Sequence, residues 1–484
     1  MTSRQNGFSP PARTSFFSLL AILILAVFSV GWLHPDEHFQ ILEFARWKLD
    51  PSNPTPLPWE FHYQMRPAIQ PAIAVALSGL LSMAGVSDPF VLTLILRLLT
   101  GILSFTALWR IWRWFEPQIA DPVLKRQFLY LSFLLWFTLY LAVRFSSETW
   151  SGAFFVIAFT FPFMGSKQGK LRFLTTGVLL GLAFITRYQA GLMVAGYMAW
   201  FLFVRKEKPA HLLMMATGFT CTAAAGVLVD RWFYGEWVLT AWNYLEQNIL
   251  YDKVSGFGIH PWYFYFTELS EALIPPFSLV IILAFLLVFL LRRKDLLTWT
   301  LLPFLLVHLT IGHKETRFLF PLAWFVPVML VKGATVVSTR YGTSWIRYRI
   351  TGILMTVFWI SNFILLTVLF FIPADRDVNL YQCVYHQKMP ATLYFVKENP
   401  YRRALQAEFY RHHGLTIAEV PGVEALDSIG GTVYLALKTH NPDLSKLKHK
   451  RVHMVYSSMP EYVKYINFNH WLDRTRIWYV FRLD

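Results

Sequence analysis

Long apolar stretches recur from near the N-terminus to residue 373, with short polar segments between them. They lie at residues 15–33, 68–86, 89–109, 127–143, 149–164, 172–186, 188–204, 211–229, 275–291, 297–311, 318–332 and 350–373. No water in a bilayer core can hydrogen-bond an exposed peptide group, so a repeated pattern of this kind predicts helices that cross a membrane. We therefore expect an all-α polytopic membrane domain over residues 15–373, preceded by a cytoplasmic N-terminus at 1–14.

The character of the sequence changes after residue 373. Residues 374–484 have ordinary polarity, and apolar and polar residues alternate at 432–437 and 477–481. Alternation with a period of two is typical of half-buried strands. This segment is predicted to be a small mixed α/β soluble domain.

Composition supports the membrane prediction and argues against a nucleic-acid partner. Of the 484 residues, 55% are hydrophobic and only 15% are charged, and the mean hydropathy is +0.41. The net charge of +15 would suit nucleic acid. However, most Lys and Arg residues lie in short segments between apolar runs, which is typical of cytoplasmic loops. We expect no nucleic-acid binding.

The basic loops also predict an orientation. If residues 167–172, 205–208, 292–294 and 347–349 are cytoplasmic, then the loop at 34–88, residues 230–262, residues 313–317 and the C-terminal domain face the other side. If residues 110–126 are cytoplasmic as well, the chain must cross the membrane an odd number of times between the external residue 34 and residue 110. The two apolar runs at 68–86 and 89–109 would give one crossing too many. We interpret 68–86 as a re-entrant or interfacial helix for this reason. The prediction is about 11 to 12 transmembrane helices, or eleven if 68–86 does not cross.

A charged motif, HPDE, follows directly after the first apolar stretch. It comprises His34 to Glu37 within the sequence GWLHPDEHFQ at 31–40. One interpretation is a helix start, because a proline in the first turn followed by Asp36 and Glu37 suits helix geometry and the helix dipole. A metal site is an alternative, since His34 and His38 have i, i+4 spacing. No matching pair of ligands stands out elsewhere, and we expect no metal.

A second charged motif, HKETRF, separates two apolar runs at residues 313–318. One interpretation is a solvated loop with Lys314 and Arg317 at the membrane interface. The predicted orientation places this hairpin on the external face, where basic residues are disfavoured. A bound anion explains them better, because Arg presents a fork that matches phosphate oxygens and Lys a point charge.

These two motifs together resemble the paired signatures of glycosyltransferase family 22, the dolichyl-phosphate-mannose-dependent mannosyltransferases. Between them, further segments are similar to that family in the same order along the chain. These are Trp59-Glu60 with Arg66-Pro67, Arg144 to Glu148, Thr186-Arg187, Asp230 to Gly235, and His260-Pro261-Trp262. The resemblance implies the GT-C fold, and the charge-based orientation independently puts all these segments on one external face.

The resemblance also implies a reaction. It would be an inverting transfer of a hexose, most simply mannose, from a polyprenyl-phosphate donor to a hydroxyl of a lipid-linked glycan or glycolipid. Asp36 is the expected general base, with Glu37 as the second candidate or as a group that positions the acceptor. Such a displacement needs a carboxylate for the acceptor proton and an electrostatic clamp for the departing phosphate. The family is regarded as metal-independent, so no cofactor is expected.

Basic residues of the similar segments are the candidates for binding the donor phosphate and the substrates. They are His34, Arg66, Arg144, Arg187, His260, His313, Lys314 and Arg317, of which Arg187, His313, Lys314 and Arg317 form the predicted clamp. Three tryptophans could stack on sugar rings or could simply lie in the aromatic belt of the membrane interface. These are Trp59, Trp237 and Trp262.

Two rival interpretations remain open at this point. A transporter or lipid flippase also places charged residues at the ends of its spans, although transporters usually keep them near the bilayer midplane and show two comparable halves. Another GT-C enzyme with a different sugar or a protein acceptor would share the same motifs. The expected location is a bacterial inner membrane, or the endoplasmic reticulum membrane if the source is eukaryotic.

Overall fold

A computed structural model describes residues 10–484 apart from 53–55, 166–168, 388–391, 404, 460–462, 464 and 466. The first nine residues of the predicted cytoplasmic N-terminus and residues 167–168 of the basic loop at 167–172 lie outside this part. The chain forms two compact units. The first unit comprises the residues up to Val27, Glu60–Ile73 and Ile95–Phe370, and the second comprises Phe28–Trp59, Ala74–Leu94 and Phe371–Asp484.

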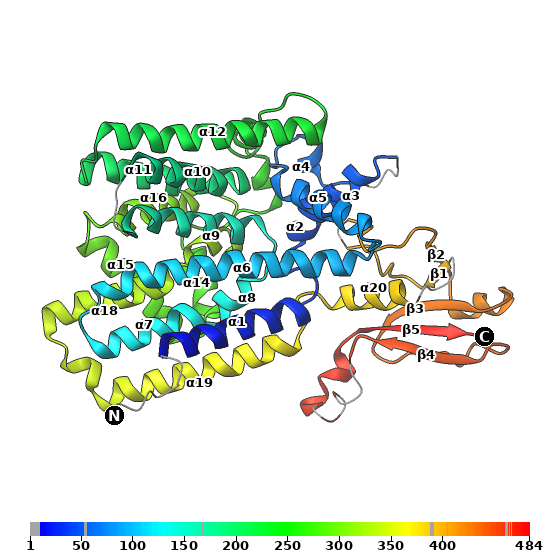
Figure 1. Cartoon of the computed structure of the whole chain (residues 1–484). Helices are drawn as coiled ribbons and strands as arrows, with labels where there is room; N and C mark the ends of the chain where they lie inside the picture. The colour runs from blue at the N-terminus through cyan, green and yellow to red at the C-terminus, as the bar shows by residue number, and fades with distance from the viewer. Residues whose placement is uncertain are drawn as a thin grey trace, which may run out of the picture. The chain divides into compact units, whose positions relative to one another are not determined.

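The regular secondary structure among the described residues of the first unit is helical, as the apolar runs predict (Figure 1). Its helices are α1 (Pro10–Phe28), α4 (Trp59–His62), α6 (Pro89–Phe115), α7 (Pro122–Leu134), α8 (Trp136–Leu141), α9 (Ser147–Thr160), α10 (Lys170–Thr186), α11 (Gly191–Ala199), α12 (Pro209–Tyr234), α13 (Thr240–Leu245), α14 (Phe264–Ala272), α15 (Phe277–Leu291), α16 (Leu296–Thr310), α17 (Phe320–Ala323), α18 (Val326–Tyr341) and α19 (Arg349–Phe371). Helices α1, α4, α6 and α19 each have residues at one end that belong to the second unit.

Close packing between α10 and α12 depends on glycines that face each other. A Cβ atom added to Gly177 would lie 2.0 Å from the carbonyl oxygen of Met215, and one added to Gly218 would lie 2.3 Å from that of Leu174. Small residues allow two helix backbones to approach in this way, which is the usual device for packing helices in lipid. The pair is therefore held at a distance that no larger residue permits.

Few helices of the first unit are long enough to span a bilayer by themselves. Among the described residues, four helices are long and apolar enough, or five if the pair α17 and α18, which meet at 70°, is one bent span. The predicted count of 11 to 12 spans therefore stays a prediction. The apolar run at 127–143 is not one helix, because α7 and α8 meet at a break at Leu135.

The break between α7 and α8 is stabilised by a side chain from α19. The amide group of Asn362 accepts a hydrogen bond from the backbone N–H of Trp136 at 2.9 Å and donates one to the carbonyl oxygen of Leu134 at 2.8 Å. An irregular backbone within lipid needs such partners, because no water is present to satisfy its peptide groups. A hydrophobicity pattern carries no sign of this arrangement.

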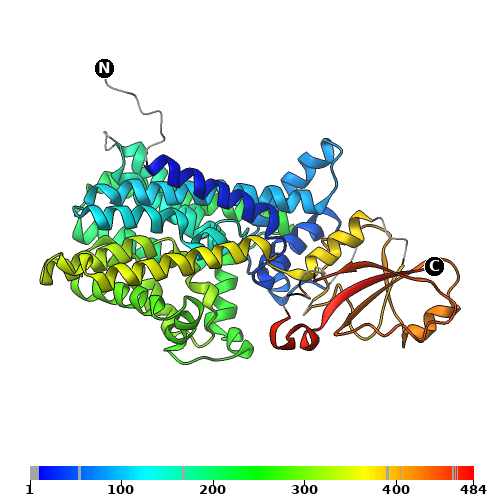
Figure 2. The ribbon, with the colours of Figure 1, turned by 90° about the horizontal axis from the view of Figure 1, so that it is seen from below.

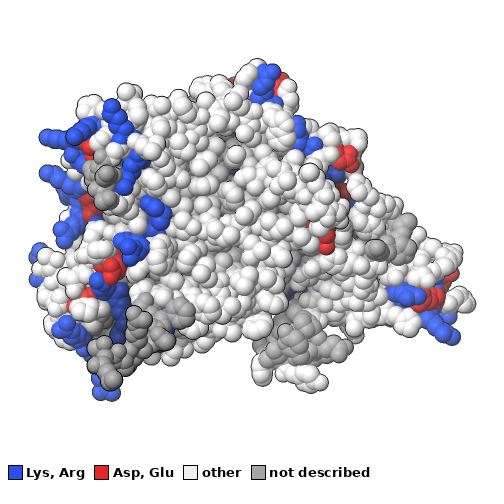
Figure 3. Space-filling model, in the orientation of Figure 1, with Lys and Arg blue, Asp and Glu red and all other residues white. Residues whose placement is uncertain are grey.

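Charge is distributed unevenly over the first unit. Lys and Arg side chains gather at the end where α7 and α18 lie, at the left of Figure 3, and the sides of the helices are nearly free of charge on the face shown. Apolar sides with a basic end are what a lipid-facing bundle with cytoplasmic loops should show.

The second unit combines short helices with a five-stranded mixed sheet, seen from below in Figure 2. Strand order is β2-β1-β3-β5-β4, with β1 parallel to β2 and β3, and β5 antiparallel to β3 and β4. The elements are α2 (Pro35–Glu37), α3 (Glu43–Leu49), α5 (Ile69–Met83, whose first turn belongs to the first unit), α20 (Arg376–His386), β1 (Thr392–Phe395), β2 (Thr416–Glu419), β3 (Val433–Thr439), β4 (Val452–Ser457) and β5 (Ile477–Leu483). The two strands predicted from alternation are confirmed as β3 and β5.

The C-terminal residues of the second unit pack with the segment that carries the HPDE motif. Gly31 adopts a φ of +94°, and a Cβ atom there would lie 2.7 Å from the Cβ of Asp375. The backbone N–H of Asp375 donates to the carbonyl oxygen of Val30 at 3.1 Å. Only glycine fits this close contact without strain.

Candidate active site

The HPDE motif opens a short helix in the second unit. His34 is the residue before the helix, and its Nδ1 accepts a hydrogen bond from the backbone N–H of Asp36 at 3.2 Å. The Glu37 carboxylate accepts from the backbone N–H of Leu33 at 3.3 Å. The side chain of Asp36 keeps 24% of its surface exposed. The predicted helix start is thus confirmed, and it still leaves an accessible carboxylate at Asp36.

His38 lies in a closed aromatic stack directly after this helix. Its ring is fully buried, with its centroid 4.3 Å from that of Trp32 and 5.4 Å from that of Tyr410. Its Nε2 lies 2.8 Å from the carboxylate of Glu43. His38 therefore has Glu43 as an internal partner. Within the described ranges, no three His, Cys, Asp or Glu side chains converge as metal ligands would.

Glu43 joins the start of α3 to a distant segment of the second unit. Besides His38, its carboxylate accepts from the backbone N–H of Phe409 at 2.9 Å and from Nε of Arg46 at 3.1 Å. Burial alone would raise the pKa of this carboxyl, but the hydrogen bonds and the positive charges of its partners outweigh burial and hold the pKa below its ordinary value. Glu43 is ionised at neutral pH and fixes the backbone after the HPDE motif.

A buried cluster of ion pairs occupies the first unit, centred on Glu148 in the first turn of α9. Oε1 of Glu148 accepts from Nη1 of Arg187 at 2.6 Å and from Nη1 of Arg317 at 3.0 Å. The glutamate is only 3% exposed, and the two arginines are 3% and 8% exposed. Arg187 is the residue that follows α10, so three separate segments converge here. Charge-assisted bonds of this kind in a low-dielectric site are strong and well oriented.

Glu315 holds the HKETRF motif against this cluster. Its carboxylate faces the guanidinium of Arg317 as a fork, with Nε and Nη2 each bonded to one oxygen. Nε2 of His313 lies 3.0 Å from the same carboxylate, and Nδ1 of His313 lies 2.9 Å from the carbonyl oxygen of Gly258. All three nitrogens of Arg317 have protein partners, so this side chain is held rigidly.

Lys314 is buried and bonds to backbone oxygens. Its ammonium group donates to the carbonyl oxygen of His260 at 2.9 Å and also to that of Ile311. The backbone N–H of His260 in turn donates to the carbonyl oxygen of Gly312. Lys314 and His260 thus join the loop before α14 to the HKETRF motif.

Arg187 differs from its neighbours in having unused donors. Nη1 donates to Glu148 and to Oγ of Ser147 at 3.1 Å, whereas Nε and Nη2 are buried without a hydrogen-bond partner among the described residues. The Phe318 ring lies 5.3 Å from the guanidinium carbons of both Arg187 and Arg317. A buried donor without a partner is costly, and two such donors on one guanidinium have the geometry to bind an anion.

Arg66 and Arg144, two further predicted site residues, contact acidic and aromatic side chains of the first unit. Arg66 pairs with Glu60 at 3.3 Å and stands 5.8 Å from the Tyr244 ring. Arg144 is 1% exposed and lies 5.1 Å from the Tyr140 ring.

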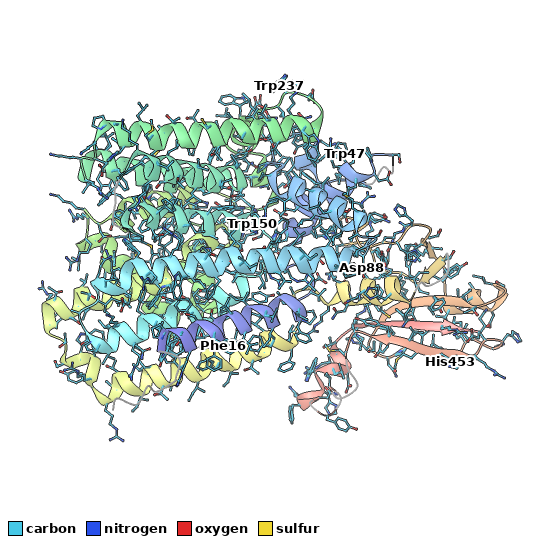
Figure 4. The ribbon with its side chains drawn as sticks, in the orientation of Figure 1. Phe16, Trp47, Asp88, Trp150, Trp237 and His453 are labelled. Atoms are coloured by element: carbon cyan, nitrogen blue, oxygen red, sulfur yellow. The ribbon has the colours of Figure 1, made fainter. Side chains whose placement is uncertain are left out.

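The three tryptophans differ in exposure. Trp59 is partly buried, whereas Trp237 and Trp262 are each 66% exposed. Trp237 lies just beyond the end of α12 (Figure 4), and its ring is 4.1 Å from the guanidinium carbon of Arg231. Exposed rings of this kind suit an interfacial belt as well as a sugar contact.

Sequence reasoning did not name Glu148, Glu315 and Glu43 as site residues. Glu148 ends the segment 144–148 that was recognised as similar to the family, and Glu315 lies within the HKETRF motif, whereas Glu43 lies in neither. The available signal was the position of each acid next to basic residues: Glu148 is four residues after Arg144, and Glu315 lies between Lys314 and Arg317. The structure shows that these acids orient the basic residues.

Comparison with known proteins agrees with this architecture. A model of the Alg9-like mannosyltransferase family matches residues 14–407. The chain belongs to the Alg9-like mannosyltransferase family. The family signature therefore covers the HPDE motif, the Glu148 cluster and the HKETRF motif together.

Several curated members of the Alg9-like mannosyltransferase family are similar to the chain. GPI alpha-1,2-mannosyltransferase 3 of Bos taurus is 29% identical over 301 residues, which are 61% of this chain and 53% of that protein. The Homo sapiens protein of the same name is 28% identical over 313 residues, 63% of this chain and 54% of that protein. The match spans about half the length of these relatives. The prediction of this family from the paired motifs is confirmed.

A solved structure shows the fold. The crystal structure of ArnT from Cupriavidus metallidurans bound to undecaprenyl phosphate aligns over 96% of this chain and 97% of that chain, with a TM-score of 0.51 and 11% identity. At this identity the likeness shows the fold alone. This Alg9-like family member is thus a GT-C membrane protein with a small C-terminal sheet.

Proposed function

We propose that this protein is an inverting mannosyltransferase. It moves mannose from a polyprenyl-phosphate donor to a hydroxyl of a lipid-linked glycan or glycolipid. The observation that carries the proposal is the unused pair of buried donors on Arg187 beside the Glu148 cluster. Family membership and the GT-C fold support the same reaction class.

The HPDE motif supplies the base. Asp36 takes the proton of the acceptor hydroxyl while the acceptor oxygen forms a bond to the anomeric carbon. The bond from that carbon to the phosphate oxygen breaks, which inverts the configuration and releases polyprenyl phosphate. Partial exposure of Asp36 and the hydrogen bond from its backbone N–H to His34 suit this role. Glu37, which accepts from Leu33, helps to position the acceptor.

The Glu148 cluster supplies the clamp for the leaving group. Negative charge on the phosphate increases as its bond to the sugar breaks, so preorganised donors stabilise the transition state more than the ground state. Arg187 is the proposed direct contact, because it alone of the predicted clamp residues keeps two nitrogens without a partner in the described structure. Arg317, His313 and Lys314 are held next to it by Glu315 and by backbone oxygens.

Topology and location complete the proposal. The protein is a multi-pass membrane protein with about eleven spans, 68–86 being interfacial, and its motifs face the external side of a bacterial inner membrane or the lumen of the endoplasmic reticulum. The basic end of the first unit would then be cytoplasmic (Figure 3).

Transfer by purified protein tests the proposal. Wild-type protein with polyprenyl-phosphate mannose and a glycolipid acceptor should give an inverted product. Asp36→Asn should abolish turnover, because general-base catalysis contributes about 10² to 10⁴ in rate. Glu37→Gln is the matched control, since both acids share the same helix start. Near wild-type transfer by Asp36→Asn, or a complete loss in Glu37→Gln alone, would assign the base elsewhere.

A further inference from the structure

A cavity with both polar and apolar walls lies within the second unit. Its volume is about 680 Å³, within the range of about 300–1,000 Å³ that small-molecule sites occupy. It is enclosed by the end of α3, the second half of α5, the start of α6, part of α20 and residues 406–415. Asp88, at the start of α6, is one of its walls (Figure 4).

We infer that this cavity binds the carbohydrate part of the acceptor, an inference that rests on the proposed function. Its lining includes three serines, Ser78, Ser82 and Ser87, together with ionisable and aromatic residues. The charges are largely compensated: Arg411 pairs with Glu408 at 2.7 Å, and Asp88 pairs with His386 at 2.7 Å. About half of the lining is apolar, but a lipid tail would need walls without ionised groups, and a phosphate would need excess positive charge. Mixed donors and acceptors with little net charge suit a polyhydroxyl ligand.

Two lining residues have hydrogen-bonding capacity that the described residues do not use. Nε of Arg46 donates to Glu43, but its buried Nη2 has no partner in the described part of the chain. Nδ1 of His412 lies 2.9 Å from the carbonyl oxygen of His413, and Nε2 of the same ring is buried without a hydrogen-bond partner within that same part. Sugar hydroxyl groups both donate and accept, so they match a guanidinium nitrogen and an imidazole nitrogen.

The cavity is connected to the HPDE motif through Glu43. This carboxylate binds His38, next to the motif, and also binds Arg46 and the backbone N–H of Phe409, two walls of the cavity. Asp36 and Arg46 lie ten residues apart along nearly continuous helical backbone, which is about 15 Å at 1.5 Å per residue. A short oligosaccharide covers such a distance, so a glycan held in the cavity can present a terminal hydroxyl to Asp36.

Filling the cavity tests the inference on the full chain in detergent. Ser82→Trp places a large ring in the cavity, and Met83→Trp is the matched control, because Met83 is the next residue of α5, 86% exposed, and not part of the wall. Ser82→Trp should raise the acceptor KM about tenfold or more, with an unchanged donor KM. His412→Ala should raise the acceptor KM about three- to tenfold, the loss of one or two hydrogen bonds.

Direct binding separates this inference from the proposed function. Saturation-transfer NMR with an α-linked mannose disaccharide should show contact in the wild type and in Met83→Trp, and none in Ser82→Trp. Unchanged acceptor KM and unchanged disaccharide binding in both cavity variants would overturn the inference, as would binding of inorganic phosphate in place of the disaccharide. A wild type that binds the disaccharide in the cavity but transfers no sugar would refute the proposed function alone.

Discussion

Replacing Glu148 with glutamine tests whether the buried cluster both stabilises the first unit and positions the clamp. The change keeps the shape of the side chain but removes its charge, leaving Arg187 and Arg317 next to each other with Glu315 as the nearest remaining acid. Two charge-assisted bonds, of 2.6 and 3.0 Å, become at best neutral ones. The net charge of Glu148, Glu315, Arg187 and Arg317 together changes from zero to +1.

The expected loss of stability follows from these contacts. A hydrogen bond to a charged group contributes about 1.5–3 kcal/mol and a neutral one about 1 kcal/mol, so two weakened bonds lose roughly 1–4 kcal/mol. Removing one partner of a buried ion pair typically costs about 3–5 kcal/mol, and glutamine retains an acceptor oxygen, which places the estimate near 3 kcal/mol. Donor KM should rise about tenfold or more, because Arg187 loses the carboxylate that orients it.

Thermal unfolding of the detergent-solubilised chain, followed by tryptophan fluorescence, measures the first effect, and transfer kinetics measure the second. Ser147→Ala is the control for donor binding. It removes a hydroxyl that accepts from Nη1 of Arg187 at 3.1 Å and donates to Oε2 of Glu148 at 3.1 Å, but it leaves every charge and both ion pairs of Glu148 in place. It should cost about 1.5–3 kcal/mol, as expected for bonds to charged groups, with little change in donor KM. A Glu148→Gln variant that melts like the wild type and keeps its donor KM would refute the reasoning.

Three further predictions follow from single contacts. Gly177→Ala should lower the melting temperature sharply or prevent folding, because its Cβ would lie 2.0 Å from a backbone oxygen, whereas Gly352→Ala, with nothing within 4 Å, should be neutral or slightly stabilising in the same fluorescence melt. Lys314→Ala should weaken donor binding more than acceptor use in titrations, since its two carbonyl contacts hold the motif in place; impaired acceptor use with intact donor affinity would assign it to the other substrate. Because the pKa of Glu43 is held below its ordinary value of 4.5, its contribution to stability is complete above that pH and is lost as the pH falls through the lowered value. Melting temperature should therefore fall at acid pH, and Glu43→Gln should flatten this dependence.

Local pattern was sufficient to predict much of the fold. Twelve apolar runs indicated a helical membrane domain, and alternation identified β3 and β5, because each signal depends only on neighbours along the chain. A pattern of neighbouring residues cannot predict where a helix is interrupted or how closely two helices approach. The break at Leu135 is stabilised by Asn362, more than 220 residues away, and the close approach of α10 and α12 depends on glycines that face each other across two helices.

The sequence motifs predicted which segments belong to the candidate site, but they did not predict how the side chains of the site contact one another. HPDE and HKETRF were recognised as charge clusters at span ends and as family signatures. The bond between Glu148 and Arg317 joins residues 169 positions apart, and no one-dimensional pattern indicates such a partner. For the same reason the sequence could name Arg187, His313, Lys314 and Arg317 as candidates for the clamp, but it could not show that their contacts differ.

Stability alone does not explain the Glu148 cluster. Desolvating two guanidinium groups and a carboxylate costs several kcal/mol per ion, and replacing a buried ion pair by apolar residues of similar volume is often neutral or stabilising. In a chain otherwise rich in apolar side chains, such a replacement would be readily accommodated. The two donor nitrogens of Arg187 that lack a partner in the described structure add a further cost that the fold does not recover. On the proposed function, the departing phosphate would recover this cost by binding to those nitrogens, so the proposal accounts for a cluster that stability does not.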